Sequence, residues 1–148
     1  MSRRKGYTLV ELIAVMGIAL LVASLIGSLH LTITRAIETE LARSEMLAGA
    51  EEVLHYLKSD VRGADAFSVG PGGLTVFRHG EAITYANAQA GVSRRSTAGS
   101  RLLGGEGITV AFSPLGGKGV QVTLRGERVA RSRTIALRRE VVIARRKP

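Results

Sequence analysis

The chain of 148 residues contains no cysteine. It therefore has neither a disulfide framework nor a thiolate site, and cysteine usage carries no information about the redox compartment. Histidine is also scarce, since His30, His55 and His79 lie far apart and no His-x-x-x-His pair occurs. Without clustered cysteine or histidine, the sequence predicts no zinc site.

Acidic residues are rare where a calcium-binding loop would need them. Between residues 70 and 119 the only acids are Glu81 and Glu106, which are too few to supply the oxygen ligands of Ca²⁺. The glycine-rich run 70–73 lacks the lysine and the serine or threonine of a phosphate-binding loop. We interpret this run as a turn.

Paired carboxylates suited to acid-base chemistry are also missing. Asp60 and Asp65 are five residues apart with Arg62 between them, and a local ion pair or a cap explains them more simply than a carboxylate dyad. We therefore expect no catalytic residue, no metal and no cofactor. The prediction is that the chain is not an enzyme.

Charge is absent from a long stretch near the N-terminus, residues 12–29, which contain eighteen uncharged residues, ten of them Leu, Ile or Val. A helix that crosses a bilayer needs about 20 mostly apolar residues, and each Leu, Ile or Val favours insertion by roughly 0.3–0.6 kcal/mol at the helix centre. We predict a transmembrane segment over residues 7–34, with these core side chains: Leu12, Ile13, Val15, Ile18, Leu21, Leu25 and Leu29.

Charges on either side of this segment predict its orientation. Arg3, Arg4 and Lys5 precede it, whereas Arg35 and two glutamates follow it, so the N-terminus should stay in the cytoplasm and the rest of the chain should face outward. A cleaved secretory signal would have a shorter apolar core and a small residue after it. We therefore predict a single-pass protein of the inner (cytoplasmic) membrane.

Glu11 is a lone carboxylate at the start of the apolar stretch. A charged group at the bilayer centre costs roughly 2.5–3.5 kcal/mol, so its charge should be compensated. One alternative is that Glu11 lies in the headgroup region, favoured by the positive end of the helix dipole. The other is that it meets a partner of opposite charge.

The run Gly6-Tyr7-Thr8-Leu9-Val10-Glu11 resembles the prepilin processing motif of type IV pilins and of the pseudopilins of type II secretion and DNA-uptake systems. The resemblance implies that residues 1–6 are a leader, that prepilin peptidase cuts between Gly6 and Tyr7, and that the new amine of Tyr7 is methylated. It also implies that Glu11 pairs with the terminal ammonium of a neighbouring subunit, so that the two charges neutralise each other in a low dielectric. The apolar stretch would then form the filament core.

Residues 35–63 have the pattern of an amphipathic helix, and the first proline is Pro71. Apolar residues recur three or four apart, and charged residues occupy the opposite face. One helix is therefore predicted from about Tyr7 to Arg62, on the order of 80 Å long, with Gly63 as a left-handed stop. The predicted apolar stripe is Leu47, Ala50, Leu54, Leu57 and Val61.

Residues 64–148 carry short β-forming stretches separated by glycine-rich turns. We predict strands at 74–77, 82–85, 108–112, 120–124 and 135–143, with turns at 79–80 and 116–119. Residues 87–107, rich in Gly, Ser and Ala, are predicted to be irregular with one weak strand near 92–94. The predicted class is α+β, with a long N-terminal helix packed on an antiparallel β-sheet domain.

Leu57, Asp60, Arg62 and Ala64 resemble the L-x-x-D-x-R-x-A pattern of the J-type pseudopilin of type II secretion and of W-type minor pilins. The run 83–85 and the arginine-rich end of the chain are similar to the same group. Major pilins commonly have a proline in this helix, which is missing here. The resemblance thus implies a minor pilin or pseudopilin, with prepilin peptidase, other subunits and an inner-membrane assembly platform as partners.

The last part of the chain is strongly basic. From residue 125 onward there are nine Lys or Arg and two Glu, so that this tail holds +7 of the total charge of +9. It could bind a polyanion such as DNA, form a solvated sheet face, or meet an acidic subunit; aromatic residues that stack bases are absent. The candidates are Arg131, Arg133, Arg138, Arg139, Arg145, Arg146 and Lys147. An uncleaved single-span membrane protein with a polyanion-binding domain is the alternative function.

Overall fold

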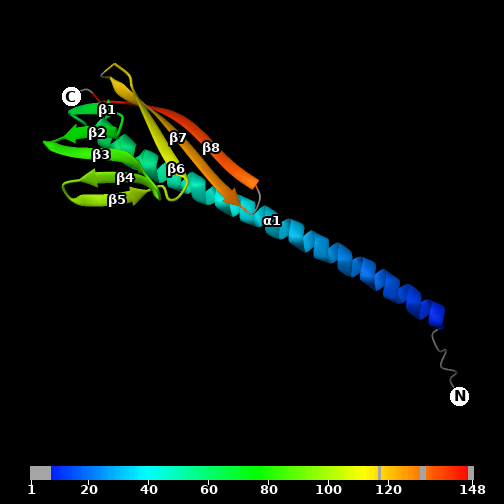
Figure 1. The fold of residues 1–148 in the computed structure, drawn as a ribbon. Coiled ribbons are helices and arrows are strands. Elements are labelled where there is room, and N and C mark those ends of the chain that lie inside the picture. Colours follow the sequence, from blue (N-terminus) through cyan, green and yellow to red (C-terminus); the bar gives the residue numbers. More distant parts are fainter. Residues whose placement is uncertain (1–7, 117, 131–132, 147–148) are drawn as a thin grey trace. The chain divides into compact units, whose positions relative to one another are not determined.

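The computed structural model describes residues 8–116, 118–130 and 133–146, apart from the side chain of Arg133. Gly6, Tyr7, Arg131 and Lys147 therefore lie outside the described residues. One helix, α1 (Leu9–Arg62), is followed by eight strands (Figure 1), which confirms the predicted α+β class. The chain divides into two compact units, one ending at Glu38 and the other beginning at Thr39.

Helix α1 ends at Arg62, as its sequence pattern predicts, but the glycine that follows does not adopt a left-handed conformation. The N–H of Gly63 still donates to the carbonyl of Ser59 at 3.3 Å, so the helical hydrogen bonding continues through it. An added Cβ would lie 3.0 Å from Nε of Arg78, a close contact that a small shift of this partly exposed side chain can relieve. The predicted left-handed stop is therefore wrong.

Strands β1 to β5 form one antiparallel sheet in sequential order, in which each strand pairs with the next. Each connection is a two-residue turn; in the turn between β2 and β3, His79 and Gly80 both have positive φ, 50° and 78°. Asp65 accepts a hydrogen bond from the N–H of His79 at 2.7 Å, so it caps this turn. The strands are β1 (Ala66–Gly70), β2 (Gly73–Arg78), β3 (Glu81–Ala88), β4 (Gly91–Ser96) and β5 (Gly99–Leu103).

The prediction that residues 87–107 are irregular is wrong for most of this range. Strand β3 continues to Ala88, and β4 and β5 follow. Gly91 and Gly99 are the first residues of these two strands, each with φ of 133°, so glycines that suggest a loop in the sequence enter hairpins instead. The prediction of a strand near 92–94 is confirmed, whereas β1 was not predicted.

The remaining strands form a second antiparallel sheet with the order β6-β7-β8. They are β6 (Ile108–Pro114), β7 (Gly119–Ala130) and β8 (Arg133–Ala144), and β7 and β8 are longer than predicted. Asn87 joins the two sheets: its Nδ2 donates to the carbonyl of Val110 at 2.9 Å, and its Oδ1 accepts from the N–H of Val110 at 2.8 Å. The side chain of Asn87 thus links β3 to β6 through two hydrogen bonds.

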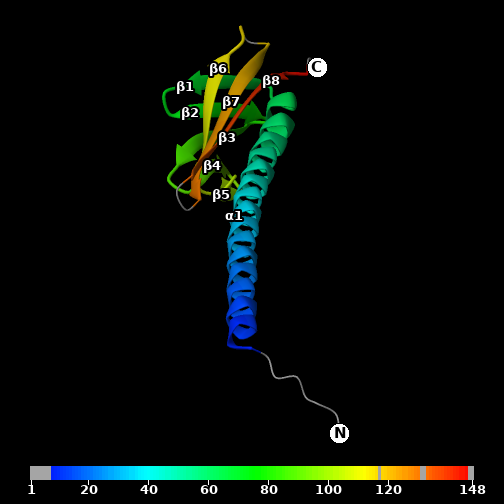
Figure 2. The same ribbon diagram turned by 90° about the vertical axis from the view of Figure 1, so that its right-hand side faces the viewer.

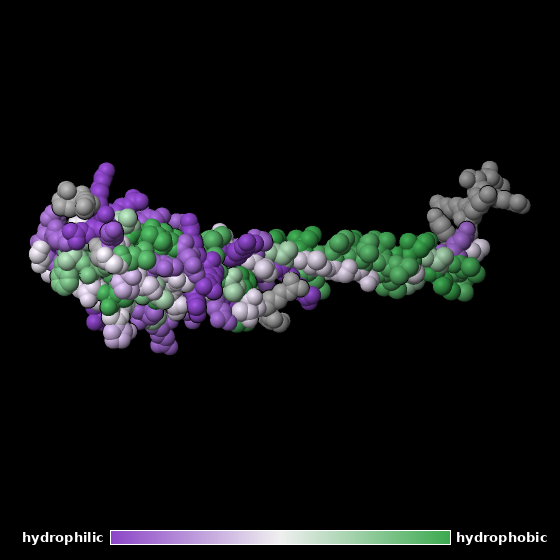
Figure 3. Space-filling model, turned by 90° about the horizontal axis from the view of Figure 1, so that it is seen from above, coloured by the Kyte–Doolittle hydropathy of each residue, from purple (hydrophilic) through white to green (hydrophobic). Residues whose placement is uncertain are grey.

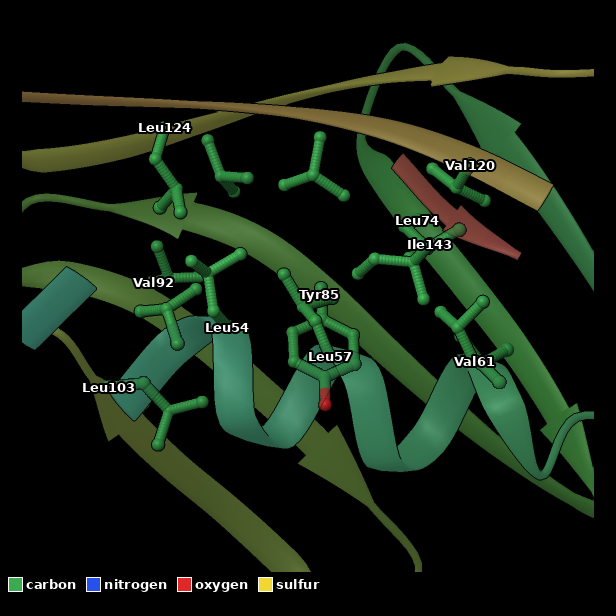
Figure 4. Close-up of a cluster of buried hydrophobic side chains, with 14 of the residues drawn as sticks. Leu54, Leu57, Val61, Leu74, Tyr85, Val92, Leu103, Val120, Leu124 and Ile143 are labelled. Carbon is green, nitrogen blue, oxygen red and sulfur yellow. The ribbon is translucent and has the colours of Figure 1, made fainter. Parts of the chain in front are cut away.

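The core of the second unit lies between the second half of α1 and both sheets (Figures 2 and 4). At its start, the buried stripe of the helix contains Met46 and not the predicted Leu47. Met46 is 4% exposed, whereas Leu47 is 40% exposed. Buried side chains from all three layers meet in Figure 4: Leu54, Leu57, Val61, Leu74, Tyr85, Val92, Leu103, Val120, Leu124 and Ile143.

The connection between β5 and β6 crosses α1 at very short range. A Cβ added to Gly49 would lie 2.1 Å from the carbonyl oxygen of Gly104, and one added to Gly104 would lie 2.8 Å from Val53. Gly104 also has φ of 81°, in the left-handed region that favours glycine. The two glycines therefore let the connection approach the helix backbone.

The five-stranded sheet has an exposed side opposite the core, which we call the outer face. Side chains alternate between the two sides of a strand, and the burial pattern identifies thirteen positions on this face. Ten of them are Gly, Ala, Ser or Thr, and only one is charged. They are Ala66, Ser68, Gly70, Thr75, Phe77, Ala82, Thr84, Ala86, Ala88, Ser93, Arg95, Ser100 and Leu102.

Candidate processing and assembly site

The start of α1 is a reciprocal cap between Thr8 and Glu11. The backbone N–H and the hydroxyl of Thr8 donate to Oε2 of Glu11 at 2.8 and 3.0 Å, and the N–H of Glu11 donates to the Thr8 hydroxyl at 3.3 Å. This is a capping box, in which a threonine and a glutamate three residues later satisfy free N–H groups at a helix start. The spacing of Thr8 and Glu11 is visible in the sequence, but the cap was not predicted.

Both carboxylate bonds of the cap are made to Oε2 of Glu11. Among the described residues, no group donates a hydrogen bond to Oε1. The carboxylate can therefore keep the helix start in place while its second oxygen meets a cation. Glu11 thus has the geometry that both interpretations of the sequence require, since it lies at the helix start and can still take a partner.

The helix after Glu11 exposes its apolar side chains on all sides. The seven predicted membrane-core residues, Leu12, Ile13, Val15, Ile18, Leu21, Leu25 and Leu29, are each 54–72% exposed. On the side shown in Figure 3, this part of the helix is coloured mostly hydrophobic. A soluble helix would bury such a surface, so these residues need lipid or other helices around them.

Hydroxyl groups within the apolar part of α1 are satisfied by the helix itself. Ser28 donates to the carbonyl of Leu25 at 2.8 Å, and Thr32 donates to that of Ser28 at 2.9 Å. Thr34 donates in the same way to His30. Because polar groups in a bilayer must be paired within the protein, these bonds remove the main cost of placing the hydroxyls in lipid. Within the described residues, α1 is long and apolar enough to cross a membrane.

A second polar cluster lies at the other end of α1, around the buried Asp60, which is 3% exposed. Oδ2 of Asp60 accepts from the Tyr85 hydroxyl at 2.5 Å and from Nε of Arg94 at 2.9 Å, and Oδ1 lies 3.8 Å from Nη1 of Arg78. All three partners come from strands, so the prediction of a local ion pair or cap is wrong for Asp60. Three strands of the five-stranded sheet are thereby joined to the end of the helix.

The Asp60 cluster affects how its members ionise. Burial raises the pKa of Tyr85 far above its usual value of 10, and the adjacent Asp60 carboxylate adds to this increase. The hydrogen bond to Asp60 raises the pKa of Arg94, which stays charged in any case. The cluster is an ion pair with a neutral phenol, in which Asp60 and Tyr85 are buried and the two arginine side chains are partly exposed.

The side of α1 next to β5 is held by a second group. Nη1 of Arg101 donates to the Tyr56 hydroxyl at 2.6 Å, and its guanidinium lies 5.0 Å from the centre of the Tyr56 ring. Glu52 accepts from the N–H of Gly104 at 3.3 Å.

No group of His, Asp and Glu among the described residues could hold a metal ion.

The basic tail is divided between the two sides of the three-stranded sheet. Arg139 points to α1 and pairs with Glu51, and Arg128 likewise pairs with Glu45. Arg138 points to the other side and pairs with Glu140 at 2.6 Å. Arg145 and Arg146 follow the end of β8, which begins at Arg133. Because side chains alternate along a strand, these candidate polyanion-binding residues do not form one continuous surface.

Comparison with known proteins agrees with this geometry at the N-terminus. Residues 1–27 match the family described as the prokaryotic N-terminal methylation motif. No curated protein and no solved structure matches the chain at a significant level.

The motif and the long apolar helix together fit a membrane-anchored protein. The match over residues 1–27 supports a type IV pilin-like protein. Its helix followed by antiparallel strands is the arrangement that the resemblance implies.

Proposed function

We propose that the chain is a minor pilin or pseudopilin that prepilin peptidase cuts between Gly6 and Tyr7. The amine of Tyr7 is then methylated, and the mature chain is assembled with other subunits on an inner-membrane platform into a pilus, secretion or DNA-uptake filament. Before assembly, residues 7–34 hold the chain in the inner membrane, with the N-terminus in the cytoplasm and the strand domain outside. In the filament the same residues pack against the helices of neighbours.

The observation that carries this proposal is the position of Glu11. It lies in the first turn of a helix whose following residues are apolar and exposed, within the N-terminal methylation motif matched over residues 1–27. A carboxylate and a terminal ammonium that leave water together remain neutral as a pair, whereas either one alone would cost several kcal/mol. Pairing with the ammonium of a neighbour therefore fixes the axial position of each new subunit.

A role as a minor subunit is supported by the second unit. Helix α1 contains no proline, and Asp60, which belongs to the motif resembling minor subunits, is buried among strand residues. The position explains why an acid occurs at this point of the motif, because Asp60 anchors the helix end to the sheet. The small size of the strand domain suits a subunit that contacts others through its surface.

Intact-mass measurement of the protein extracted from membranes tests the proposal. We expect a mass that lacks residues 1–6 and carries one added methyl group on Tyr7. Replacing Gly6 by a bulky residue should leave the full-length precursor in the membrane. A wild-type chain that keeps its leader in a host that processes other prepilins would contradict the proposal and favour the uncleaved polyanion-binding alternative.

A further inference from the structure

The outer face of the five-stranded sheet is nearly free of charge, although 22% of the chain is charged. Its only charged residue is Arg95, and the other large side chains are Phe77 and Leu102. The exposed side of the three-stranded sheet differs, since it carries Arg125, Glu127, Arg138 and Glu140. Solvated faces of antiparallel sheets are normally polar, whereas depletion of charge is typical of the centre of a protein interface.

One row of side chains crosses the whole outer face. The strand register places Ser68, Thr75, Thr84, Arg95 and Ser100 side by side across β1 to β5. The neighbours of Arg95 in this row are short hydroxyl side chains, which leave its guanidinium accessible. Among the described residues, Arg95 has no ion pair and no side-chain hydrogen bond, so its charge is available to a partner.

Two exposed apolar side chains lie on either side of this row. Phe77 is 42% exposed and Leu102 is 50% exposed. Phe77 lies two residues from Thr75 along β2, and the register places it opposite Ala82. Leu102 lies two residues from Ser100 along β5, and the register places it opposite Ser93. The two apolar side chains therefore lie on opposite sides of the row. The face therefore offers two apolar contacts with one cation between them on a flat surface of small residues.

We propose that the outer face binds another protein, which presents a carboxylate to Arg95 within a surface of apolar or small residues. Charge complementarity selects this partner, because the outer face supplies a cation and no acid. Two copies of the chain meeting through this face would bring together two arginines and no carboxylate, which is unfavourable when the groups lose water. A symmetric pairing of two outer faces is therefore disfavoured, and the partner that we propose is a different protein.

The size of the face indicates how strong this contact is. Five strands about 4.8 Å apart and about five residues long cover on the order of 400 Å², roughly half of the area that one partner contributes to a standard interface. The contact is thus weak when it acts alone. Cross-linking in place tests it more directly than co-purification does.

The experiment places a photoreactive amino acid in the full-length chain, in its native host, at Phe77 or at Leu102. Matched controls carry it at Val142 or Val129, which are 63% and 69% exposed on the other sheet. We expect a single adduct of discrete mass from the outer face, with one attached protein identified by mass spectrometry. Arg95→Glu should lower its yield at least about tenfold, and Arg95→Lys should retain most of it.

Four results would overturn the proposal. They are equal adduct yields from the control positions, an adduct with a second copy of this chain, adducts only with glycan or lipid, and an Arg95→Glu yield equal to that of the unchanged residue. Because the face belongs to the strand domain, the inference does not depend on cleavage after Gly6. The mass of the cross-linked chain reports separately whether residues 1–6 have been removed.

Discussion

The hydroxyl of Tyr85 donates a hydrogen bond to the buried carboxylate of Asp60 at 2.5 Å, across 25 residues of sequence. This bond joins the end of α1 to the middle strand of the five-stranded sheet. Arg94 adds a second bond to the same oxygen from the adjacent strand. The unusual feature of the core is therefore a buried acid whose partners come from three strands.

Tyr85→Phe should destabilise the domain by about 1–3 kcal/mol, because a buried carboxylate loses one of its donors. Denaturant unfolding of the full chain in detergent measures the change. Tyr56→Phe is the matched control, since its hydroxyl meets only the exposed Arg101; it should cost less than about 1 kcal/mol. An effect at Tyr85 no larger than that at Tyr56 would contradict the role assigned to the Asp60 cluster.

Stability should fall in alkali because of Tyr85. Its pKa is raised by burial and by Asp60, so the folded state holds the proton more tightly than the unfolded state does. This contribution is complete below the unfolded-state pKa of about 10 and decreases as the pH rises above it. Unfolding measured against pH should show a loss of stability above pH about 10 that is smaller in Tyr85→Phe. Identical pH profiles for the two proteins would refute this assignment.

Gly49→Ala should destabilise the domain, although alanine normally stabilises a helix by about 0.5–1 kcal/mol relative to glycine. The added Cβ would lie 2.1 Å from the Gly104 carbonyl oxygen, so the connection after β5 has to move, at a cost of about 1–3 kcal/mol. Gly72→Ala is a suitable control, because nothing lies within 4 Å of its added Cβ. Thermal unfolding compares the two, and a stabilised Gly49→Ala protein would show that the close approach is absent.

Asn87→Ala should weaken the connection between the two sheets. It removes the partners of both the N–H and the carbonyl of Val110, which are partly buried, and unsatisfied groups of this kind cost about 1–3 kcal/mol. Hydrogen exchange at Val110 should accelerate more than exchange at Leu124 in the centre of β7. Unchanged exchange at Val110 would indicate that β6 is held without this side chain.

Sequence periodicity predicted the parts of the fold that depend on local patterns. The three-to-four spacing of Leu54, Leu57 and Val61 predicted the buried stripe. The alternation of Val120, Val122 and Leu124 predicted the first part of β7. Strands β4 and β5 were missed for most of their length because Gly, Ser and Ala resemble a loop in composition. In the structure those small residues form the outer face of a regular sheet.

The site could be predicted in part for a related reason. Thr8 and Glu11 are three residues apart, so their cap follows from spacing alone once a helix start is assumed. The partners of Asp60 are 18, 25 and 34 residues away, and no local pattern identifies them. One signal was present, because Asp60 lies three residues after Leu57 within the apolar stripe, where an acid needs a buried partner.

We propose that Glu11 meets the terminal ammonium of a neighbouring subunit, and Glu11→Gln tests this pairing most directly. Glutamine keeps an oxygen that can accept the bonds from Thr8, so the helix start is preserved while the charge is removed. Glu40→Gln, at an exposed residue beyond the apolar stretch, is the matched control.

The quantity to measure is the fraction of processed chain recovered in filaments. We expect Glu11→Gln to be cut normally but to enter filaments on the order of 100-fold less, the factor that corresponds to leaving one charge unpaired. Incorporation equal to that of wild type and Glu40→Gln would contradict the claim.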